Sequence, residues 1–389
     1  MTDLVRILAL WRELEAVGKD YVLATVVAVQ GSSYRKPGAL MLLTADGRRI
    51  GTVSGGCLEA QVASRAWWLT ANGPVIQRYT TTEDDGDRPY GSGCGGVIHL
   101  LLERRSTAGV LLAAVENAFN RRVPFSAAVV LDGPQIGRRA FAGLDPEPSE
   151  SSLHKNNEAK ASNESLQALA DRCIEARAPI EAEFISENSR IRAWADYRPA
   201  RPSLAIFGAG DDAQPLLRLA KELGWFVYVA DGRTQLATRD RHPQADELFT
   251  LPINEIPSPL DQPLAPFAKL GAADAAVVMT HSFEQDSKIL ASLLALPSPP
   301  AYIGVLGPQR RTRELLAEAA RLLSLPASAI AAQAERWLTG LHAPTGLELG
   351  ADSPETIALS VLAEIQKFRT GATALPLRDV RAAQAAAAG

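Results

Sequence analysis

The sequence predicts an α/β protein in which a mixed α+β domain is followed by a doubly wound parallel sheet. After residue 203, β-like runs alternate with amphipathic helical stretches, which is the pattern of repeated βαβ units. Before residue 200, the β-like runs are short and are joined by glycine-rich turns. The length of 389 residues exceeds that of one ordinary hydrophobic core, so at least two domains are expected.

Shifts in composition along the chain predict where the domains end. We expect the first domain over residues 1–198, the second over 203–370, and a fraying, alanine-rich tail over 371–389. Within the first domain, residues 145–164 are rich in Pro, Ser, Asn, Glu and Lys and carry too little apolar area to offset the entropy of ordering. That segment therefore predicts a mobile surface loop.

Apolar periodicity predicts the individual elements. In the first domain, we expect helices over 3–17, 59–69, 109–120 and 166–177, and strands over 21–30, 39–43, 49–53, 75–79, 97–103, 126–131, 138–141 and 180–185. In the second domain, we expect parallel strands over 204–207, 225–230, 247–251, 275–280 and 302–306, with helices over 213–223, 284–296, 310–323 and 354–368.

Residues 204–231 read as the first strand-turn-helix-strand unit of a Rossmann-type domain. Gly208 allows a tight turn after the first strand, and Gly210 lets the backbone approach a phosphate. Ala213 supplies the third small residue, where the helix packs on the strand. Asp231 ends the second strand, the position at which a carboxylate binds the hydroxyls of a ribose.

Two aspartates weaken the usual functional conclusion from this unit. Asp211 and Asp212 stand where the helix begins, and a helix N-terminus attracts anions. Two carboxylates there would satisfy that field as plain helix caps and repel a pyrophosphate. We therefore predict the Rossmann fold without predicting that it binds a dinucleotide tightly.

The bulk composition excludes several classes of function. The net charge of −4 and the absence of a basic stripe argue against nucleic-acid binding. No apolar run is long enough to cross a membrane, and the first residues do not resemble a secretory signal. Three cysteines are too few for a disulfide framework, so a reducing cytoplasm is the expected location.

Three glycine-rich segments of the first domain predict a binding site. Glycine clusters let backbone N–H groups converge on an anion, and neighbouring hydroxyl and cationic side chains add donors. Cys57 precedes an expected helix, a placement that favours the thiolate. The alternative is that the segments are tight turns and the cysteines are small buried hydrophobes, as we expect for Cys173. The residues concerned are Ser32, Ser33, Arg35 and Gly38; Gly55, Gly56, Cys57 and Glu59; and Gly93, Cys94 and Gly95.

The second domain adds further candidates at the ends of its expected strands. His281 follows the fourth strand, where open α/β sheets place their ligands, so it either binds a ligand or donates a proton, or else it caps a loop. Asp286 is expected to pair with it. The cationic run over residues 310–313 indicates either an anionic partner or a solvated helix face.

These motifs together resemble the XdhC/CoxI family, accessory proteins for molybdenum hydroxylases such as xanthine dehydrogenase. The first domain matches at the GSS, SGGCLE and GCGG segments. The second matches at GAG, VADGR, THSFEQD, YIGVLG and PTGLELGADSPETIALSVLAEI. The family commonly has a histidine after GAG, where this chain has Asp211, so a ligand contact at that position is in doubt.

The resemblance implies a homodimeric chaperone rather than an enzyme. Such proteins bind the molybdenum cofactor, present this pterin to a cysteine desulfurase for addition of a sulfido ligand, and insert it into an apo-hydroxylase of the xanthine dehydrogenase type. It also implies that Cys57 and Cys94 are the candidates for contact with the metal or its sulfur, which agrees with the preference of such a metal for soft ligands. Gly208, Gly210, Asp231 and His281 complete the predicted cofactor-binding set.

Two other functions stay open at this stage. One is an NAD(P)-dependent oxidoreductase that uses the Rossmann domain conventionally, with His281 as acid or base. The paired aspartates and the lack of a further evident catalytic set disfavour it. The other is a plain assembly scaffold that binds neither ligand.

Overall fold

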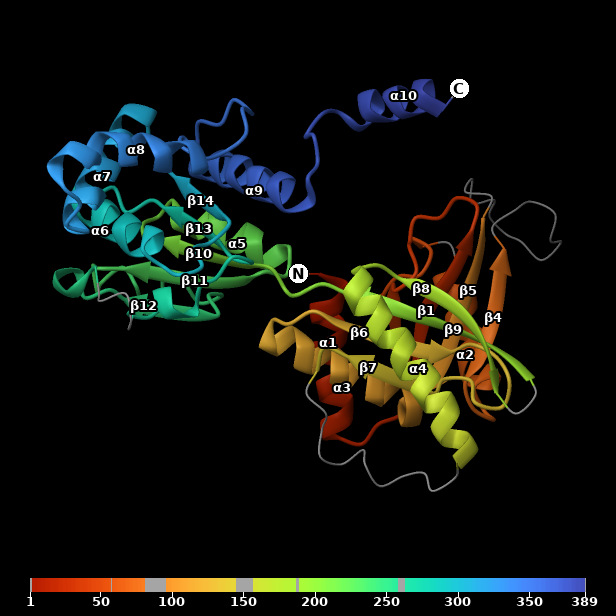
Figure 1. Ribbon diagram of the computed structural model, residues 1–389. Helices are drawn as coiled ribbons and strands as arrows, with labels where there is room; N and C mark the ends of the chain where they lie inside the picture. Colours follow the sequence, from red (N-terminus) through yellow and green to blue (C-terminus); the bar gives the residue numbers. More distant parts are fainter. Residues whose placement is uncertain are drawn as a thin grey trace. The chain divides into compact units, whose positions relative to one another are not determined.

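Two units make up the chain, Met1–Arg201 and Pro202–Gly389 (Figure 1). The computed structural model describes residues 2–56, 58–80, 96–144, 157–186, 189–257 and 263–388. Each hydrophobic core draws its residues from one unit alone. Within the described residues, no helix is both long and apolar enough to cross a membrane.

The first unit contains an antiparallel five-stranded sheet in the order β3-β2-β1-β5-β4. Helices α1 and α3 cover one face and α2 covers the other. The alternation along β1 sets this arrangement, because Tyr21 and Leu23 pack against α1 and α3 whereas Val22 and Ala24 pack on the α2 side. The elements are α1 (Asp3–Ala16), β1 (Tyr21–Gln30), β2 (Leu40–Thr44), β3 (Arg49–Gly51), α2 (Glu59–Leu69), β4 (Val75–Thr80), β5 (Val97–Arg104) and α3 (Arg105–Arg121).

A second antiparallel sheet in the same unit has the order β7-β6-β9-β8. Helix α4 packs on one face through Leu166, Leu169 and Cys173. The other face meets the first sheet, where Trp194 packs with Val27. The elements are β6 (Phe125–Val130), β7 (Arg139–Ala142), α4 (Asn157–Ala176), β8 (Ile180–Ser186) and β9 (Ser189–Arg198).

The second unit contains a five-stranded parallel sheet in the order β12-β11-β10-β13-β14. Helices α5 and α9 cover one face, and α6, α7 and α8 cover the other (Figure 1). This is the doubly wound, Rossmann-type fold that the sequence predicts. The elements are β10 (Ser203–Phe207), α5 (Ala213–Glu222), β11 (Phe226–Asp231), β12 (Glu247–Thr250), β13 (Ala275–Val278), α6 (Phe283–Leu294), β14 (Tyr302–Val305), α7 (Gln309–Leu322), α8 (Ala327–Gly340) and α9 (Pro354–Thr370).

The strand order places a switch point beside β10. The chain moves outward from β10 to β11 and β12, then returns to the other side of β10 with β13 and β14. Loops that follow β10 and β13 therefore leave the sheet in opposite directions at their carboxyl ends. Sheets of this kind bind ligands in the crevice that results.

Two segments, one expected to be a mobile loop and the other a fraying tail, contain helices. Residues 157–164 of the expected mobile loop belong to α4, and residues 145–156 lie outside the described residues. The expected fraying tail contains α10 (Leu377–Ala388). Residues of high helix propensity outweigh the shortage of apolar surface, namely Ala, Glu and Lys in residues 157–164 and mainly Ala in α10.

Candidate functional site

The glycine-rich segments of the first unit converge at the carboxyl end of β1. Arg35 Nε donates to the carbonyl of Thr52 at 3.1 Å and to its Oγ1 at 2.7 Å. A Cβ added to Gly55 would lie 3.2 Å from Tyr34 Cβ. One added to Gly96 would lie 2.2 Å from the Ser32 carbonyl oxygen. The loop over residues 31–38, residues 52–56 and the start of β5 are therefore packed together, and at Gly96 the backbones approach so closely that only glycine fits.

The two cysteines assigned to this site lie outside the described residues. The same is true of the flanking glycines in the third segment. The residues are Cys57, Gly93, Cys94 and Gly95.

Glu59 organises the loop over residues 52–58 from inside. Its Oε1 accepts from the backbone N–H groups of Val53 and Ser54 at 3.0 and 2.9 Å. Its Oε2 accepts from the Ser54 hydroxyl, at 2.7 Å, and from the N–H groups of Gly56 and Leu58, at 3.0 and 3.1 Å. Burial would raise the Glu59 pKa, but these hydrogen bonds outweigh it and lower the pKa.

An internal carboxylate thus takes the N–H groups that the sequence suggested for an external anion. Glu59 is only 3% exposed, and α2 begins at this residue. Its place in the predicted cofactor-binding set stays a prediction. The contacts indicate that it would act by shaping the loop.

Several side chains of the converging loops face solvent. Ser32 and Lys36 are exposed, and Tyr34 is 75% exposed although its Cβ packs on Gly55. Arg35 is less available, because it also forms an ion pair with Asp3. The loop over residues 31–38 therefore presents a hydroxyl and an ammonium group to solvent, and its aromatic side chain lies against the exposed Gly55.

Gly38 brings β9 into the same region. A Cβ at Gly38, whose φ is +92°, would lie 2.8 Å from an Asp196 carboxylate oxygen. Arg198 pairs with Asp196 at 2.9 Å and donates to the Gly38 carbonyl at 3.0 Å. Burial raises the pKa of Asp196, although Arg198 opposes that shift. Sequence reasoning missed Asp196 and Arg198, which lie about 160 residues away and carry no motif of their own.

In the second unit, the structure confirms the tight turn after β10. Gly208 has a φ of +130°, and a Cβ there would lie 2.5 Å from the Met279 carbonyl oxygen. The Gly208 N–H donates to the Ala230 carbonyl at 2.8 Å. The turn therefore runs directly between the neighbouring strands β11 and β13.

Asp231 is fully buried, and each of its two carboxylate oxygens accepts two hydrogen bonds from the protein. Its Oδ1 accepts from the Arg233 N–H at 2.8 Å and from Arg233 Nε at 2.9 Å. Its Oδ2 accepts from the Ala209 N–H at 2.8 Å and from Arg233 Nη2 at 2.7 Å. Burial would raise the Asp231 pKa, but these contacts lower it. The carboxylate predicted to bind ribose hydroxyls holds Arg233 in this structure, and its place in the cofactor-binding set stays a prediction.

The paired aspartates do not act as helix caps, which corrects that expectation. Asp212 precedes α5 without a side-chain cap hydrogen bond. Its Oδ2 lies 2.7 Å from His281 Nε2, whereas Asp211 pairs with Arg241 at 2.6 Å. Asp212 also lies 2.7 Å from the position of a Cβ at Gly210, so a carboxylate stands where the motif would admit a phosphate.

The expected pairing of His281 with Asp286 is wrong. Asp286 is buried and accepts from the Thr280 hydroxyl at 2.6 Å and from Arg311 Nη2 at 2.7 Å. His281 is 64% exposed and has a φ of +62°, a conformation that costs energy outside glycine. The cationic run over residues 310–313 is also not uniformly solvated, since Arg311 turns inward.

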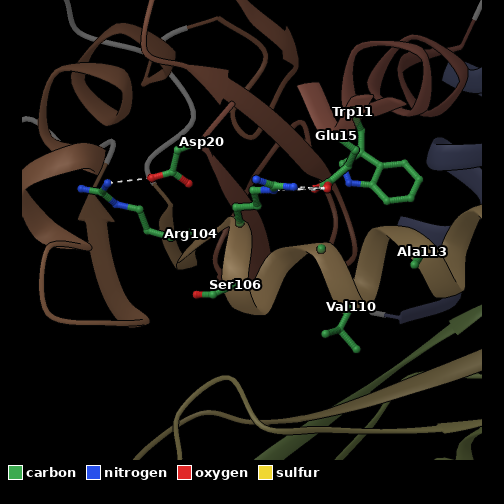
Figure 2. A pocket seen from close by; sticks show the side chains of 9 residues that line it. Trp11, Glu15, Asp20, Arg104, Ser106, Val110 and Ala113 are labelled. Atoms are coloured by element: carbon green, nitrogen blue, oxygen red, sulfur yellow. Dashed lines mark hydrogen bonds and ion pairs between the residues drawn. The ribbon is translucent and has the colours of Figure 1, made fainter. Parts of the chain in front are cut away.

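A separate concavity of about 750 Å³ lies at the opposite end of β1, next to α1 and the start of α3 (Figure 2). Its arginines are already paired. Arg104 donates to Asp20 at 2.9 Å, and Arg105 donates to Glu15 at 2.7 Å. Ten residues of extended strand separate it from the glycine loops, a span of about 30 Å. None of the predicted site residues lines it.

No metal cluster accompanies these sites in the described part of the chain. There, no group of three or more His, Cys, Asp and Glu side chains is arranged to hold a metal ion. Both cysteines named as possible metal contacts fall outside that part.

Comparisons with known proteins agree with the motifs in both units. Family models match at residues 14–80, described as the XdhC and CoxI family, and at residues 204–365, described as the XdhC Rossmann domain. A relative from Bacillus subtilis (strain 168), whose name describes a probable xanthine dehydrogenase subunit, is 30% identical over 90% of this chain and 94% of its own length.

Two further relatives extend the likeness. The molybdenum cofactor insertion chaperone PaoD from Escherichia coli (strain K12) is 25% identical over 90% of this chain and 84% of its own length. A crystal structure described as a xanthine dehydrogenase from Bacillus halodurans is 26% identical, with a TM-score of 0.66, and covers 97% of this chain and 98% of its own. The identity and coverage of the Bacillus subtilis relative, with matching family models in both units, show that this chain belongs to the XdhC and CoxI family.

Proposed function

We propose that this protein is a chaperone that binds the molybdenum cofactor and inserts it into a molybdenum hydroxylase related to xanthine dehydrogenase. The observation that carries the proposal is the convergence of the glycine loops at the carboxyl end of β1, in a chain that is similar to PaoD over 90% of its length. An insertion chaperone must hold its cargo without transforming it. A binding surface, rather than a catalytic constellation, is what that task requires.

The donor set of the glycine loops fits the cofactor's chemistry. The cofactor is an anionic pterin phosphate with a dithiolene-bound metal. Ser32 and Lys36 supply a hydroxyl and a cation, and the exposed Tyr34 ring offers a face for a flat pterin. In the sequence, Cys57 stands between Gly56 and Leu58, which both donate to Glu59, and Cys94 stands two residues before Gly96. When bound, the cofactor would supply a metal centre that suits soft ligands such as cysteine thiolates.

The proposal includes the partners that such a chaperone requires. They are an apo-hydroxylase of the xanthine dehydrogenase type, which receives the cofactor, and a cysteine desulfurase, which supplies its sulfido ligand. We further propose that the protein acts as a homodimer in the cytoplasm, where thiols stay reduced.

The contacts of Asp231 argue against conventional use of the Rossmann domain by NAD(P). A ribose diol needs a carboxylate acceptor, and both Asp231 oxygens already accept two hydrogen bonds each. The Asp212 carboxylate also stands beside Gly210. No observation in the described residues favours the oxidoreductase.

The test is retention of added cofactor by the protein and its cysteine variants. Purified molybdenum cofactor is mixed anaerobically with wild type, Cys57→Ala, Cys94→Ala or Cys173→Ala, and pterin that elutes with the protein from a desalting column is quantified. Cys173 is a matched control, because it is buried in the core beneath α4. Wild type and Cys173→Ala should retain pterin, and at least one of the other two should lose most of it. Equal retention by all four proteins rules out the cysteine assignment, and no retention by wild type rules out the proposed function.

A further inference from the structure

We propose that the carboxyl edge of the parallel sheet binds the phosphate group of a small molecule through Arg233 and Arg311. This site differs from the glycine turn of the Rossmann motif. It lies beyond the carboxyl ends of β11 and β13, next to the first turns of α6 and α7. The inference does not depend on the proposed chaperone function.

Both arginines pair with carboxylates that are buried. The Asp231 side chain is 0% exposed and the Asp286 side chain is 1% exposed, whereas Arg233 is 36% exposed and Arg311 is 27% exposed. Burying a carboxylate is costly unless it is well paired. Here each buried carboxylate fixes one guanidinium, and the exposed part of that guanidinium is held in a defined orientation.

The two arginines approach the same peptide segment. Arg233 Nη2 donates to the Thr280 carbonyl at 3.3 Å. Asp286, which binds Arg311, accepts from the Thr280 N–H at 3.2 Å and from its hydroxyl at 2.6 Å. The charges of Asp212 and Asp286 also act on Arg233, that of Asp212 the more strongly. The segment after β13 therefore draws both cations to one edge of the sheet.

Donors remain for a ligand at this edge. Among the described residues, the Arg311 guanidinium has Asp286 as its hydrogen-bond acceptor through Nη2, which leaves its Nε and Nη1 for an anion. These two donors lie on different edges of the planar guanidinium, so each would donate a single charge-assisted hydrogen bond to a phosphate oxygen. His281 adds an exposed ring in a strained conformation directly after Thr280. Such strain is concentrated at functional sites.

The position of Asp212 decides which side of the crevice is open. Its carboxylate stands beside Gly210 and contacts His281, so it repels an anion at the start of α5. Because Asp212 also acts on Arg233, an incoming phosphate is favoured at the Arg311 end of this edge, with Arg233 as its second cation. Two classes of molecule share this chemistry, a phosphorylated pterin and a nucleotide.

The experiment is a calorimetric titration with inorganic pyrophosphate at low ionic strength. The main variant is Asp286→Asn/Arg311→Gln, which removes an ion pair without changing the net charge. Asn keeps an oxygen for the two Thr280 donors. The matched control is Arg310→Gln/Glu314→Gln, which removes an exposed ion pair from the same helix.

Wild type and the control should bind pyrophosphate equally, and the main variant should bind it at least about tenfold more weakly, because a charge-assisted hydrogen bond contributes about 1.5–3 kcal/mol. A wild type that does not bind, or a main variant that binds as wild type does, overturns the proposal. If the main variant does not fold, the pyrophosphate affinity of Asp212→Asn tests the site. It should bind pyrophosphate several-fold more tightly, and unchanged or weaker binding overturns the site.

Competition then identifies the source of the phosphate. Displacement of pyrophosphate by a phosphorylated pterin assigns the site to the cofactor, and displacement by NAD⁺ or NADP⁺ assigns it to a nucleotide. Either result supports the site. The titration needs no molybdenum cofactor, so failure of the chaperone proposal in the retention assay leaves it intact.

Discussion

Glu59, Asp231 and Asp286 are acidic side chains whose partners lie within the protein. Each is nearly or fully buried, and each accepts hydrogen bonds that shape a loop or fix an arginine. In a sequence, such residues resemble ligand-binding groups because they stand inside motifs. A motif gives the position of a carboxylate and not the direction in which it points.

The carboxylate of Glu59 should be essential to the stability of the first unit. In Glu59→Gln, an amide –NH₂ replaces one oxygen and faces N–H donors, which leaves buried donors without an acceptor. We expect a loss of about 2–4 kcal/mol in the free energy of unfolding, measured with urea. Glu13→Gln is the control, because Glu13 is 57% exposed, and it should change stability by less than about 0.5 kcal/mol. A Glu59→Gln protein as stable as this control would contradict the assignment.

The depressed Glu59 pKa predicts a dependence of stability on pH. A carboxylate with a lowered pKa in the folded state stabilises fully above its ordinary value of 4.5 and loses this contribution as the pH falls through the folded value. Wild type should therefore lose stability below about pH 4.5 more steeply than Glu59→Gln does. Urea titrations from pH 6 to pH 3 measure both slopes, and parallel slopes would contradict the pKa direction.

Among single residues, backbone requirements were easier to predict than polar contacts. The tight turn at Gly208 and the buried place of Cys173 follow from spacing along the chain. Asp196 was missed because the loop that it contacts at Gly38 is distant in sequence, and Arg233 was missed because its ion pair with Asp231 carries no motif. Only the folded chain shows that Arg233 turns back onto Asp231.

At the level of elements, the turn after β10 gives the clearest prediction. In Gly208→Ala, the new Cβ would lie 2.5 Å from the Met279 carbonyl, at a φ of +130° that alanine rarely adopts. We expect a loss of about 3 kcal/mol or more, because β10 and β13 must separate. Gly271→Ala is the control, since nothing lies within 4 Å of its added Cβ. Thermal unfolding measures both, and equal melting temperatures would contradict the close approach.

The parallel strands were predictable as elements, whereas several others were not. The strands β10, β11, β13 and β14 are short apolar runs, buried on both faces, and stand out in the sequence. In contrast, β9 mixes arginines with apolar residues, because one of its faces meets α4 and its ends reach solvent. The helix α8 is mostly alanine and small polar residues, so its apolar face is weak. Packing against a neighbour, not local pattern, stabilises these two.

For the whole molecule, the separate cores predict independent folding. Every buried apolar cluster lies within residues 1–201 or within residues 202–389. A chain of residues 202–389 alone should therefore show a cooperative urea transition and the circular dichroism of an α/β protein. A gradual, non-cooperative transition would show that its core depends on the first unit.

The broad class of the protein could be derived from the sequence, and the site only in part. Ordered motifs over both units predicted the XdhC and CoxI family, which the comparisons confirm. The expectation of an accessory protein rather than an enzyme agrees with the name of the PaoD relative. The convergence of residues 31–38 with residues 52–58 followed no local rule, because it depends on how β1 and β2 pair.

The most direct test of this account is the content of the protein as it leaves the cell. The full chain is purified from a molybdenum-replete host and denatured, and the released pterin and nicotinamide nucleotide are quantified per protein chain. We expect pterin in near-stoichiometric amount, with little NAD(H) or NADP(H). Recovery of nicotinamide nucleotide without pterin would contradict it.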